Sequence, residues 1–285
     1  MVLLFIVLTA TLASAELVVE GYYNKGKTNA FSLVFFIAVF VALFFFFTSG
    51  FTFDFTPKTF LYGALYGVCY IGGYLFLVLA IKEGGVALSG LIISFSLVLP
   101  IFFSIIAYSE MPTVFYWIGC GLLALSLTCV GLPRKKQQEQ GIKLGWKWVL
   151  FIVVALVSNG GCGIIQTAFQ RATGGVNKSE FMLVAMSIVA TTMLICMLAT
   201  RKKGLCLKRS LLFGGACGLI NASMNLLSIL AIVAVKNVSM IYPLSSSLKL
   251  ILSAVASYLF FKERPDKLRL AGLLLGAVAV VFLNF

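Results

Sequence analysis

The sequence contains no histidine and few acidic residues, and these absences exclude several kinds of site. Only 9 of the 285 residues are Asp or Glu, and charged residues of both signs make up 11%. Without histidine the chain lacks a common metal ligand, an imidazole general base and the base of a Ser-His-Asp triad. No other metal-ligand cluster, glycine-rich phosphate loop or nucleophile motif appears. The sequence therefore predicts no catalytic site, no metal site and no cofactor.

Hydrophobic residues dominate what is present: they make up 61% of the chain, and the mean hydropathy is +1.07. A soluble domain cannot carry this composition and keep a polar surface. The apolar segments are continuous rather than alternating, which excludes a membrane β-barrel. Each is close to the roughly 20 residues that a membrane-crossing helix needs. We expect an all-α integral membrane protein with ten transmembrane helices, at Val2–Tyr23, Ala30–Ser49, Thr59–Ile81, Gly85–Tyr108, Thr113–Leu132, Trp148–Gln170, Phe181–Thr200, Ser210–Val235, Val238–Phe261 and Leu268–Phe285.

Seven cysteines occur, and no two of them form a Cys-x-x-Cys pair. All but Cys206 lie within apolar segments, and their number is odd. We expect free thiols inside the membrane region rather than a disulfide framework.

The basic residues are distributed unevenly among the loops. Loops after the odd-numbered segments, with their edges, hold 17 Lys and Arg, whereas those after the even-numbered segments hold 4. The positive-inside rule puts the richer side in the cytoplasm and both termini outside. Leu12–Ala15 resembles a signal-peptidase site, but cleavage there would reverse this orientation, so we expect the first segment to be a retained helix. The net charge of +13 is then a topology signal, and the expected partner is the lipid bilayer, not nucleic acid.

The two halves of the chain match each other. Each half holds five segments, and because five is odd the halves must enter the membrane in opposite senses. The sequence therefore predicts two inverted repeats, 1–132 and 148–285, joined by a loop at 133–147, a pattern typical of secondary transporters. At an offset of 151, Gly63 and Gly67 fall on Gly214 and Gly218, and at an offset of 153, Glu110, Pro112 and Gly119 fall on Glu263, Pro265 and Gly272.

These features resemble the drug/metabolite transporter superfamily of the EamA type. The resemblance covers the whole chain and is carried by the matched turns Tyr108–Pro112 and Phe261–Pro265 and by the glycine-rich closing segment Leu270–Ala277. It implies that the first, third, fourth, sixth, eighth and ninth segments line a central cavity. Ala15–Leu17 also resembles the Ala-Glu step of small multidrug resistance proteins, in which the glutamate exchanges protons for a cationic substrate. The chain departs from many EamA relatives in its outward termini.

Two ionisable residues lie deep inside apolar segments, where a charge costs about 2.5–3.5 kcal/mol on insertion scales. Glu16 lies near the middle of the first segment and Lys249 near the middle of the ninth. They either form a structural ion pair or face a wet cavity and bind substrate or a proton. Glu20 is a second candidate for proton coupling, although snorkelling to the interface also explains it.

A stripe of tyrosines follows one face of the third segment. Tyr62 fits an interfacial aromatic belt. The others lie too deep for that role, and hydroxyl groups facing lipid would be costly. In the repeat alignment Tyr70 and Tyr74 correspond to Asn221 and Asn225, so we expect two polar stripes facing one central pocket, with interhelical hydrogen bonding as the alternative. The deep tyrosines are Tyr66, Tyr70 and Tyr74.

Two further segments carry polar groups beside helix-weakening residues. The sixth holds Asn159, three glycines and Gln166, and the glycines permit close helix approach or local unwinding. In the ninth, Pro243 frees a backbone carbonyl that neighbouring hydroxyls can bond. Pro100 is expected to kink the fourth segment in the same way. The polar candidates of the ninth segment are Tyr242, Ser245, Ser246 and Lys249, which is expected to contact the substrate or to alternate between partners.

Taken as a transporter, the chain is expected to move a small polar metabolite, zwitterionic or an organic ion and amino-acid-like, by alternating access, with protons as a coupling ion. The expected location is a bacterial inner or plasma membrane. A flippase for a lipid-linked headgroup is the alternative, because the fold does not exclude it. An integral-membrane enzyme is a weaker alternative, because most of the nine acids sit singly in loops.

Overall fold

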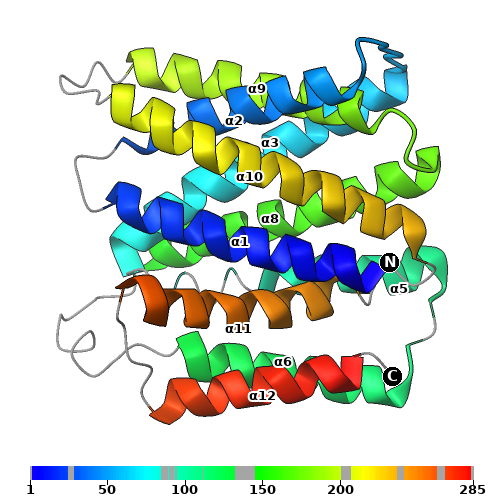
Figure 1. Cartoon of the computed structure of the whole chain (residues 1–285), viewed down its shortest axis with the longest axis vertical. Coiled ribbons are helices and arrows are strands. Elements are labelled where there is room, and N and C mark those ends of the chain that lie inside the picture. Colours follow the sequence, from blue (N-terminus) through cyan, green and yellow to red (C-terminus); the bar gives the residue numbers. More distant parts are fainter. Residues whose placement is uncertain are drawn as a thin grey trace. The chain divides into compact units, whose positions relative to one another are not determined.

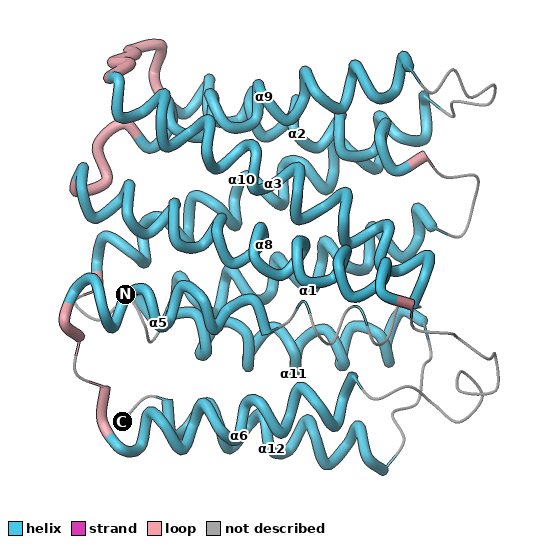
Figure 2. Tube along the Cα trace, turned by 180° about the vertical axis from the view of Figure 1, so that it is seen from behind, coloured by secondary structure: helices cyan, strands magenta, loops and turns pink. Residues whose placement is uncertain are grey.

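The computed structural model describes residues 2–24, 29–84, 89, 93, 95–110, 112–131, 145–199, 207–235, 241–261 and 267–283. These residues form helices joined by short turns, and no strand occurs among them (Figures 1 and 2). The elements are α1 (Val2–Asn24), α2 (Ala30–Thr48), α3 (Pro57–Gly84), the 3-10 turn η1 (Phe95–Leu97), α5 (Val98–Tyr108), α6 (Val114–Gly131), α8 (Trp146–Thr173), α9 (Lys178–Ala199), α10 (Leu207–Ala234), α11 (Ile241–Phe261) and α12 (Lys267–Leu283).

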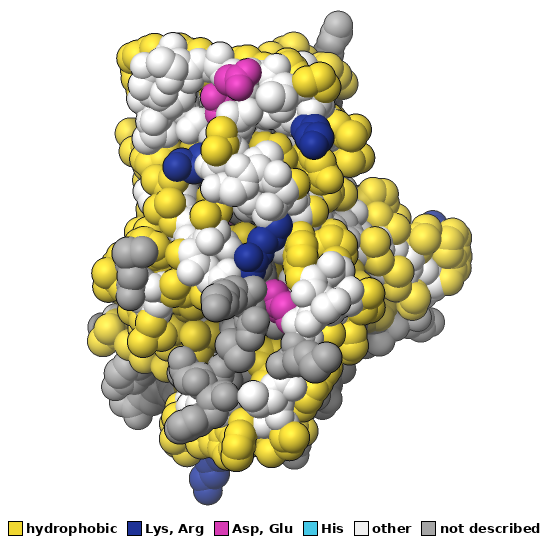
Figure 3. Space-filling model, turned by 90° about the vertical axis from the view of Figure 1, so that its right-hand side faces the viewer, with side chains coloured by type: hydrophobic (Ala, Val, Ile, Leu, Met, Phe, Trp, Pro, Cys, Tyr) yellow, Lys and Arg dark blue, Asp and Glu magenta, His cyan; other side chains and the backbone are white. Residues whose placement is uncertain are grey.

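Six of the described helices are long and apolar enough to cross a membrane: α1, α2, α3, α8, α9 and α10. Hydrophobic side chains make up most of the surface in Figure 3, and charged side chains form isolated spots among them. Large apolar side chains stay exposed, such as Ile106 at 77% and Leu212 at 71%. Such a surface is unfavourable in water and favourable in hydrocarbon, consistent with a multi-pass membrane protein.

Nine of the predicted segments begin and end within a few residues of a helix, and the fourth, Gly85–Tyr108, differs. Ser89 and Ile93 are helical, η1 then tightens the backbone into a 3-10 turn, and α5 begins only at Val98. Proline lacks an N–H group and clashes with the preceding turn, so a helix through Pro100 must deform or restart nearby. Pro100 lies in the first turn of α5, directly after the 3-10 turn, and the predicted kink at this residue stays a prediction.

The chain divides into two compact units, and each unit takes segments from both halves of the sequence. Unit 1 comprises residues 1–68 and 168–235, and unit 2 comprises residues 69–167 and 236–285. The units therefore do not coincide with the predicted repeats, which stay a prediction. The six described cysteines are free, as expected, and Cys206 lies outside the described residues.

In unit 1, α2 packs against both α9 and α10 (Figure 1). A Cβ atom added at Gly214 of α10 would lie 2.6 Å from the Cβ atom of Phe36. One turn further, a Cβ atom at Gly218 would lie 2.7 Å from the Cβ atom of Phe40 and 2.9 Å from the carbonyl oxygen of Ile37. Real Cβ atoms do not approach other atoms this closely, so glycine is what allows α2 and α10 to touch.

A second crossing in unit 1 uses glycines of α3 against α9. A Cβ atom added at Gly63 would lie 2.9 Å from the Cβ atom of Val184. At Gly67 it would lie 2.8 Å from the carbonyl oxygen of Ala185 and 3.3 Å from Ile188. The two crossings therefore have the same form: two glycines one turn apart on one helix meet a side chain, a carbonyl group and a second side chain on the other.

The two crossings also share a register. The glycines of α10 follow those of α3 by 151 residues, and their partners on α9 follow those on α2 by 148 residues throughout. The first turns of α2 and α9 match too. The backbone oxygen of Asn29 accepts the Leu33 N–H at 3.1 Å, and the backbone oxygen of Asn177 accepts the Phe181 N–H at 3.0 Å. The residues of α2 and α9 that occupy equivalent positions in the two crossings are Phe36 and Val184, Ile37 and Ala185, and Phe40 and Ile188.

In unit 2, α6 packs along α12 (Figure 2), and their contact combines apolar burial with one buried hydrogen bond. Leu123 and Ala279 are buried in the apolar cluster between them. The Ser126 hydroxyl donates to the carbonyl oxygen of Gly272 at 2.6 Å. That glycine is the one the sequence comparison pairs with Gly119 of α6.

Candidate functional site

The deepest acidic residue of α1 lies against the asparagines of α10 in unit 1. The Nδ2 atom of Asn221 donates to the Oε1 atom of Glu16 at 3.0 Å, and the Glu16 side chain is half-buried. Asn225 donates from Nδ2 to both the backbone oxygen and Oδ1 of Asn221, each at 2.9 Å. Asn225 thus holds the Asn221 amide so that its N–H₂ group points to the carboxylate.

Glu20 lies on the same side of α1, one turn after Glu16. Both carboxylates act electrostatically on Cys217, which is fully buried on α10 one turn before Asn221. The contact between α1 and α10 is therefore acidic and polar over two turns, in a region that is otherwise apolar. We call Glu16, Glu20, Asn221 and Asn225 the acidic site.

The tyrosine stripe of α3 divides between the two units. Tyr66 is 5% exposed, and its ring contacts Phe181 at a centroid distance of 5.3 Å. Tyr62 contacts Phe169 at 5.7 Å, and Phe169 stacks on Phe181 at 4.6 Å. Packing in this aromatic cluster accounts for the positions of Tyr62 and Tyr66 in unit 1.

The last two tyrosines of the stripe, Tyr70 and Tyr74, do not belong to this aromatic cluster of unit 1. Tyr70 and Tyr74 are half-buried residues of unit 2, whereas Asn221 and Asn225 belong to unit 1. The expectation that these four side chains border one pocket therefore stays a prediction. The same holds for substrate contact by Tyr66.

Three helices of unit 2 meet at the glycines of α8. Asn159 donates from Nδ2 to the Ser96 hydroxyl at 2.7 Å. A Cβ atom added at Gly163 would lie 3.0 Å from Pro100 of α5 and 3.4 Å from the ring of Tyr242 of α11. The predicted close helix approach at these glycines is confirmed, and it brings Tyr242 of α11 to α8, the helix that contains Asn159.

Hydrogen bonds hold the α11 tyrosine in place. Its hydroxyl donates to the carbonyl oxygen of Gly163 at 2.9 Å and also bonds the hydroxyl of Thr167. Because a phenol has one proton, Tyr242 must accept from Thr167. The neighbouring serines Ser245 and Ser246 are half-buried and Lys249 is exposed. Their contact with substrate, and a partnership of Lys249 with Glu16, stay predictions.

Four polar side chains are buried with at least one atom that has no hydrogen-bond partner. Ser104 and Ser247 each have an unbonded hydroxyl, Gln166 has an unbonded Nε2, and Gln170 has both amide atoms unbonded. Gln166 was a sequence candidate, and Ser247 belongs to the run of serines after Pro243 whose hydroxyls were expected to bond a freed carbonyl or substrate. Ser104 and Gln170 carry no sequence signal beyond being polar residues in apolar helices, and a helical serine usually satisfies itself, as Ser14 does on the Ala10 carbonyl at 2.9 Å.

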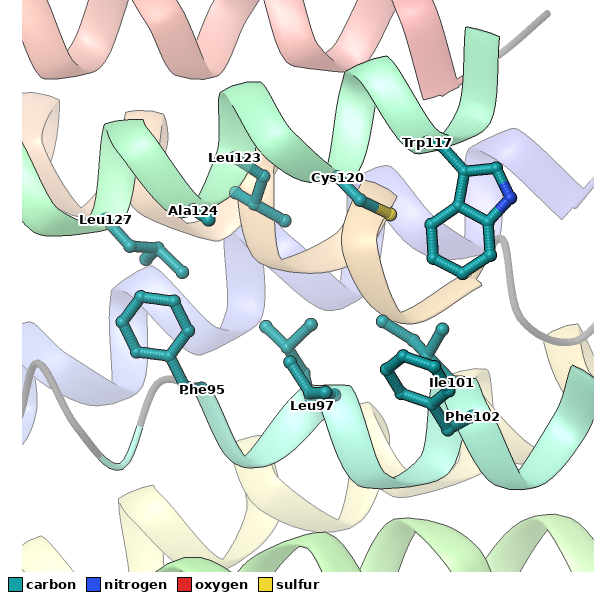
Figure 4. A pocket seen from close by; sticks show the side chains of 10 residues that line it. Phe95, Leu97, Ile101, Phe102, Trp117, Cys120, Leu123, Ala124 and Leu127 are labelled. Atoms are coloured by element: carbon teal, nitrogen blue, oxygen red, sulfur yellow. The ribbon is translucent and has the colours of Figure 1, made fainter. Parts of the chain in front are cut away.

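Two hollows of unit 1 and unit 2 contain none of the predicted site residues. In Figure 4 the side chains of η1 and α5 face those of α6 across an apolar gap, with Leu97 opposite Leu123 and Ile101 opposite Cys120. A shallower hollow lies between the start of α3 and α9 and includes Leu61 and Val184. Such linings suit lipid tails better than a polar metabolite. Among the described residues, no three His, Cys, Asp or Glu side chains gather closely enough to hold a metal ion.

Comparisons with known proteins give the fold and no name. No protein-family model matches the chain, and no curated protein matches it significantly. A solved crystal structure of a protein whose name states no function superposes with a TM-score of 0.77 at 16% identity. The match covers 97% of this chain and 94% of the other. At this identity the likeness shows that the fold occurs in an experimentally determined protein.

Proposed function

We propose that the chain is a secondary active transporter that moves a small polar metabolite by alternating access, with protons coupled through Glu16. The observation that carries the proposal is the acidic site: a carboxylate inside an apolar, membrane-length helix, bonded by Asn221 on a second such helix. A charge inside the membrane is costly, and a hydrogen bond to a charged group returns only about 1.5–3 kcal/mol. Proton or cation binding is a reason to keep it.

The paired glycine crossings support an inverted repeat, the architecture on which alternating access is built. The α3–α9 and α2–α10 contacts use equivalent residues at offsets of 151 and 148. Because each half contributes five predicted helices, equivalent contacts relate oppositely oriented halves. On this architecture and the matched turns of the sequence, we assign the chain to the EamA type of the drug/metabolite transporter superfamily, in a bacterial inner or plasma membrane.

The substrate proposed is zwitterionic or an organic ion, and amino-acid-like. Glu16 of the acidic site offers negative charge to an ammonium group. Lys249 offers positive charge to an acidic group.

Ligand binding and proton-driven uptake test the proposal. We expect at least one amino acid, amine or organic acid to raise the melting temperature of the purified protein, since a ligand that binds only the folded state stabilises it by RT ln(1 + [L]/Kd). The same compound should accumulate in proteoliposomes under an imposed pH gradient. Stabilisation by none of these compounds, together with accumulation of none, would contradict the proposal.

The orientation is a separate prediction from the 17 to 4 distribution of Lys and Arg. A reporter enzyme active only outside the cytoplasm should be active when fused after Phe285, and a reporter active only in the cytoplasm should be silent there. Fusion within the basic loop at 133–147 gives the reciprocal control. Cytoplasmic activity at the C-terminus would reverse the orientation and agree with the many EamA relatives whose termini are cytoplasmic.

A further inference from the structure

Unit 2 contains a polar seam between α5 and α8 that is only partly satisfied. Ser96 and Pro100 lie on the face of η1 and α5 that meets α8, and Ser104 follows Pro100 by one helical turn. We call these three successive turns the levels of the contact. At the first level Ser96 bonds Asn159 of α8, and at the second level Pro100 faces Gly163 of α8. We call this contact the α5–α8 seam.

The two helices run in the same direction along this seam. A Cβ atom at Gly160 would meet the Ser96 carbonyl oxygen at 2.8 Å, and one at Gly163 would meet Pro100. One further turn brings α5 to Ser104 and α8 to Gln166. By this spacing Ser104 and Gln166 occupy the third level of the seam, and each has a polar atom without a hydrogen-bond partner.

The polar side chains at the first two levels of the seam form hydrogen bonds, and those at the third level have unbonded polar atoms. Asn159 donates to Ser96, and Tyr242 and Thr167 use their protons on Gly163 and Tyr242. By contrast the Ser104 hydroxyl and the Gln166 Nε2 atom have no partner, although the residues are 0% and 8% exposed. A buried donor without an acceptor destabilises the folded protein, so its retention calls for an acceptor that arrives from outside.

A third polar group without a partner, and the second hydroxyl, belongs to α11, the helix that supplies Tyr242. Ser247 is fully buried, and its Oγ atom has no hydrogen bond. Ile251, one turn further, packs against the buried cluster of Leu123, Leu127 and Ala279, and Phe95 and Leu97 of η1 pack against the same cluster. The three unbonded groups, the hydroxyls of Ser104 and Ser247 and the Nε2 atom of Gln166, can all donate a hydrogen bond. The Nε2 atom can only donate.

We propose that Ser104 and Gln166, with Ser247 as a neighbouring donor, form the binding site for the carboxylate group of an amino-acid-like substrate. A carboxylate accepts at two oxygens and donates nothing, which matches a set of unspent donors, and charge-assisted hydrogen bonds are about twice as strong as neutral ones. Lys249, on the same helix as Tyr242, adds the positive charge that a buried carboxylate favours. The inference rests on the proposed transport function and concerns residues of unit 2 alone.

Matched ligand pairs test the role of the carboxylate. We would measure the melting temperature of the purified full chain with L-serine, L-leucine and L-phenylalanine, and with the amines that lack only their carboxyl groups: ethanolamine, isoamylamine and phenethylamine. At least one amino acid should stabilise the protein, and its amine should not. An amine as effective as its amino acid, or no response to any pair, would overturn the assignment.

Substitutions separate binding from structure. Ser104→Ala and Gln166→Leu remove unpartnered polar atoms, so each should leave the unliganded melting temperature equal or higher while raising the Kd of the amino acid at least about tenfold. Gln166→Glu places a negative charge beside the carboxylate and should abolish binding. Ser126→Ala is the control, because it breaks a satisfied bond to Gly272 and should lower stability without changing the Kd.

The possible outcomes distinguish this site from the proposed function. Lower unliganded stability in Ser104→Ala and Gln166→Leu with an unchanged Kd makes both residues structural, and the assignment fails. If uptake of another metabolite remains driven by the pH gradient and dependent on Glu16, transport stands while the carboxylate site falls. If amino acids bind through Ser104 and Gln166 yet never cross the membrane, the site stands and transport falls.

Discussion

Glu16→Gln should abolish uptake driven by a pH gradient and leave the fold intact. A carboxamide has the size of the carboxylic acid and can still accept the Asn221 bond, which is 3.0 Å long, but it neither binds nor releases a proton. Uptake into proteoliposomes should fall to that of empty liposomes, while the melting temperature stays within a few degrees of the unsubstituted protein. Undiminished pH-driven uptake would move the coupling role to Glu20 or to no residue of the acidic site.

A second buried acid provides the matched control. Glu180 of α9 is 7% exposed, belongs to unit 1 and accepts the backbone N–H of Asp54 at 3.2 Å. Its contact is with the chain that precedes α3, so its role is structural. Glu180→Gln should weaken that hydrogen bond, costing about 1 kcal/mol or less, and leave the pH dependence of uptake unchanged. A loss of coupling in both variants would show that the assay reports damage to unit 1, not the chemistry of Glu16.

Gly214→Ala should lower the stability of the protein, although alanine is the better helix former. The added methyl group would meet the Cβ atom of Phe36 at 2.6 Å and the carbonyl oxygen of Leu33 at 3.1 Å, so α2 and α10 must separate. Overpacking of this kind typically costs about 1–3 kcal/mol, against a gain of up to about 1 kcal/mol from helix propensity. Thermal unfolding in detergent measures the sum, and we expect a lower melting temperature.

Two companion variants make the result specific. Gly63→Ala at the equivalent crossing should be destabilised too, because its methyl group would meet Val184 at 2.9 Å. Gly121→Ala on α6 has no atom within 4 Å of the added methyl group, so its stability should be equal or higher. If the Gly214→Ala variant is as stable as the Gly121→Ala variant, glycine is not what allows α2 and α10 to touch.

The positions of the helices could be predicted from the sequence because the bilayer, rather than tertiary packing, sets the length of an apolar segment. The segment predicted at Ala30–Ser49 is found at Ala30–Thr48, and that at Thr113–Leu132 at Val114–Gly131. Ends extend where polar residues continue the helix, as in α3, which runs from Pro57 to Gly84. The 3-10 turn before Pro100 could not be placed, because proline limits a helix without fixing where the preceding chain bends.

The candidate site was predictable in its residue types and less so in its pairings. The cost of a charge in an apolar helix singled out Glu16, and the repeat alignment singled out Asn221, but no periodicity indicates that these two bond each other, and the sequence offered Lys249 as the partner of Glu16. The unbonded hydroxyl of Ser104 was not singled out, because whether a helical serine bonds its own backbone depends on the neighbouring helix. Helix-to-helix register is the information that a single sequence lacks.

Proton movement during substrate entry tests the central claim most directly. Proteoliposomes containing a trapped pH-sensitive dye would receive a stabilising substrate on the outside, with no imposed pH gradient and with membrane potential clamped. Proton-coupled transport predicts that the internal pH changes as the substrate enters, and that Glu16→Gln proteoliposomes show no change. Substrate entry at constant internal pH in the unsubstituted protein, at an unaltered rate in Glu16→Gln, would contradict the account.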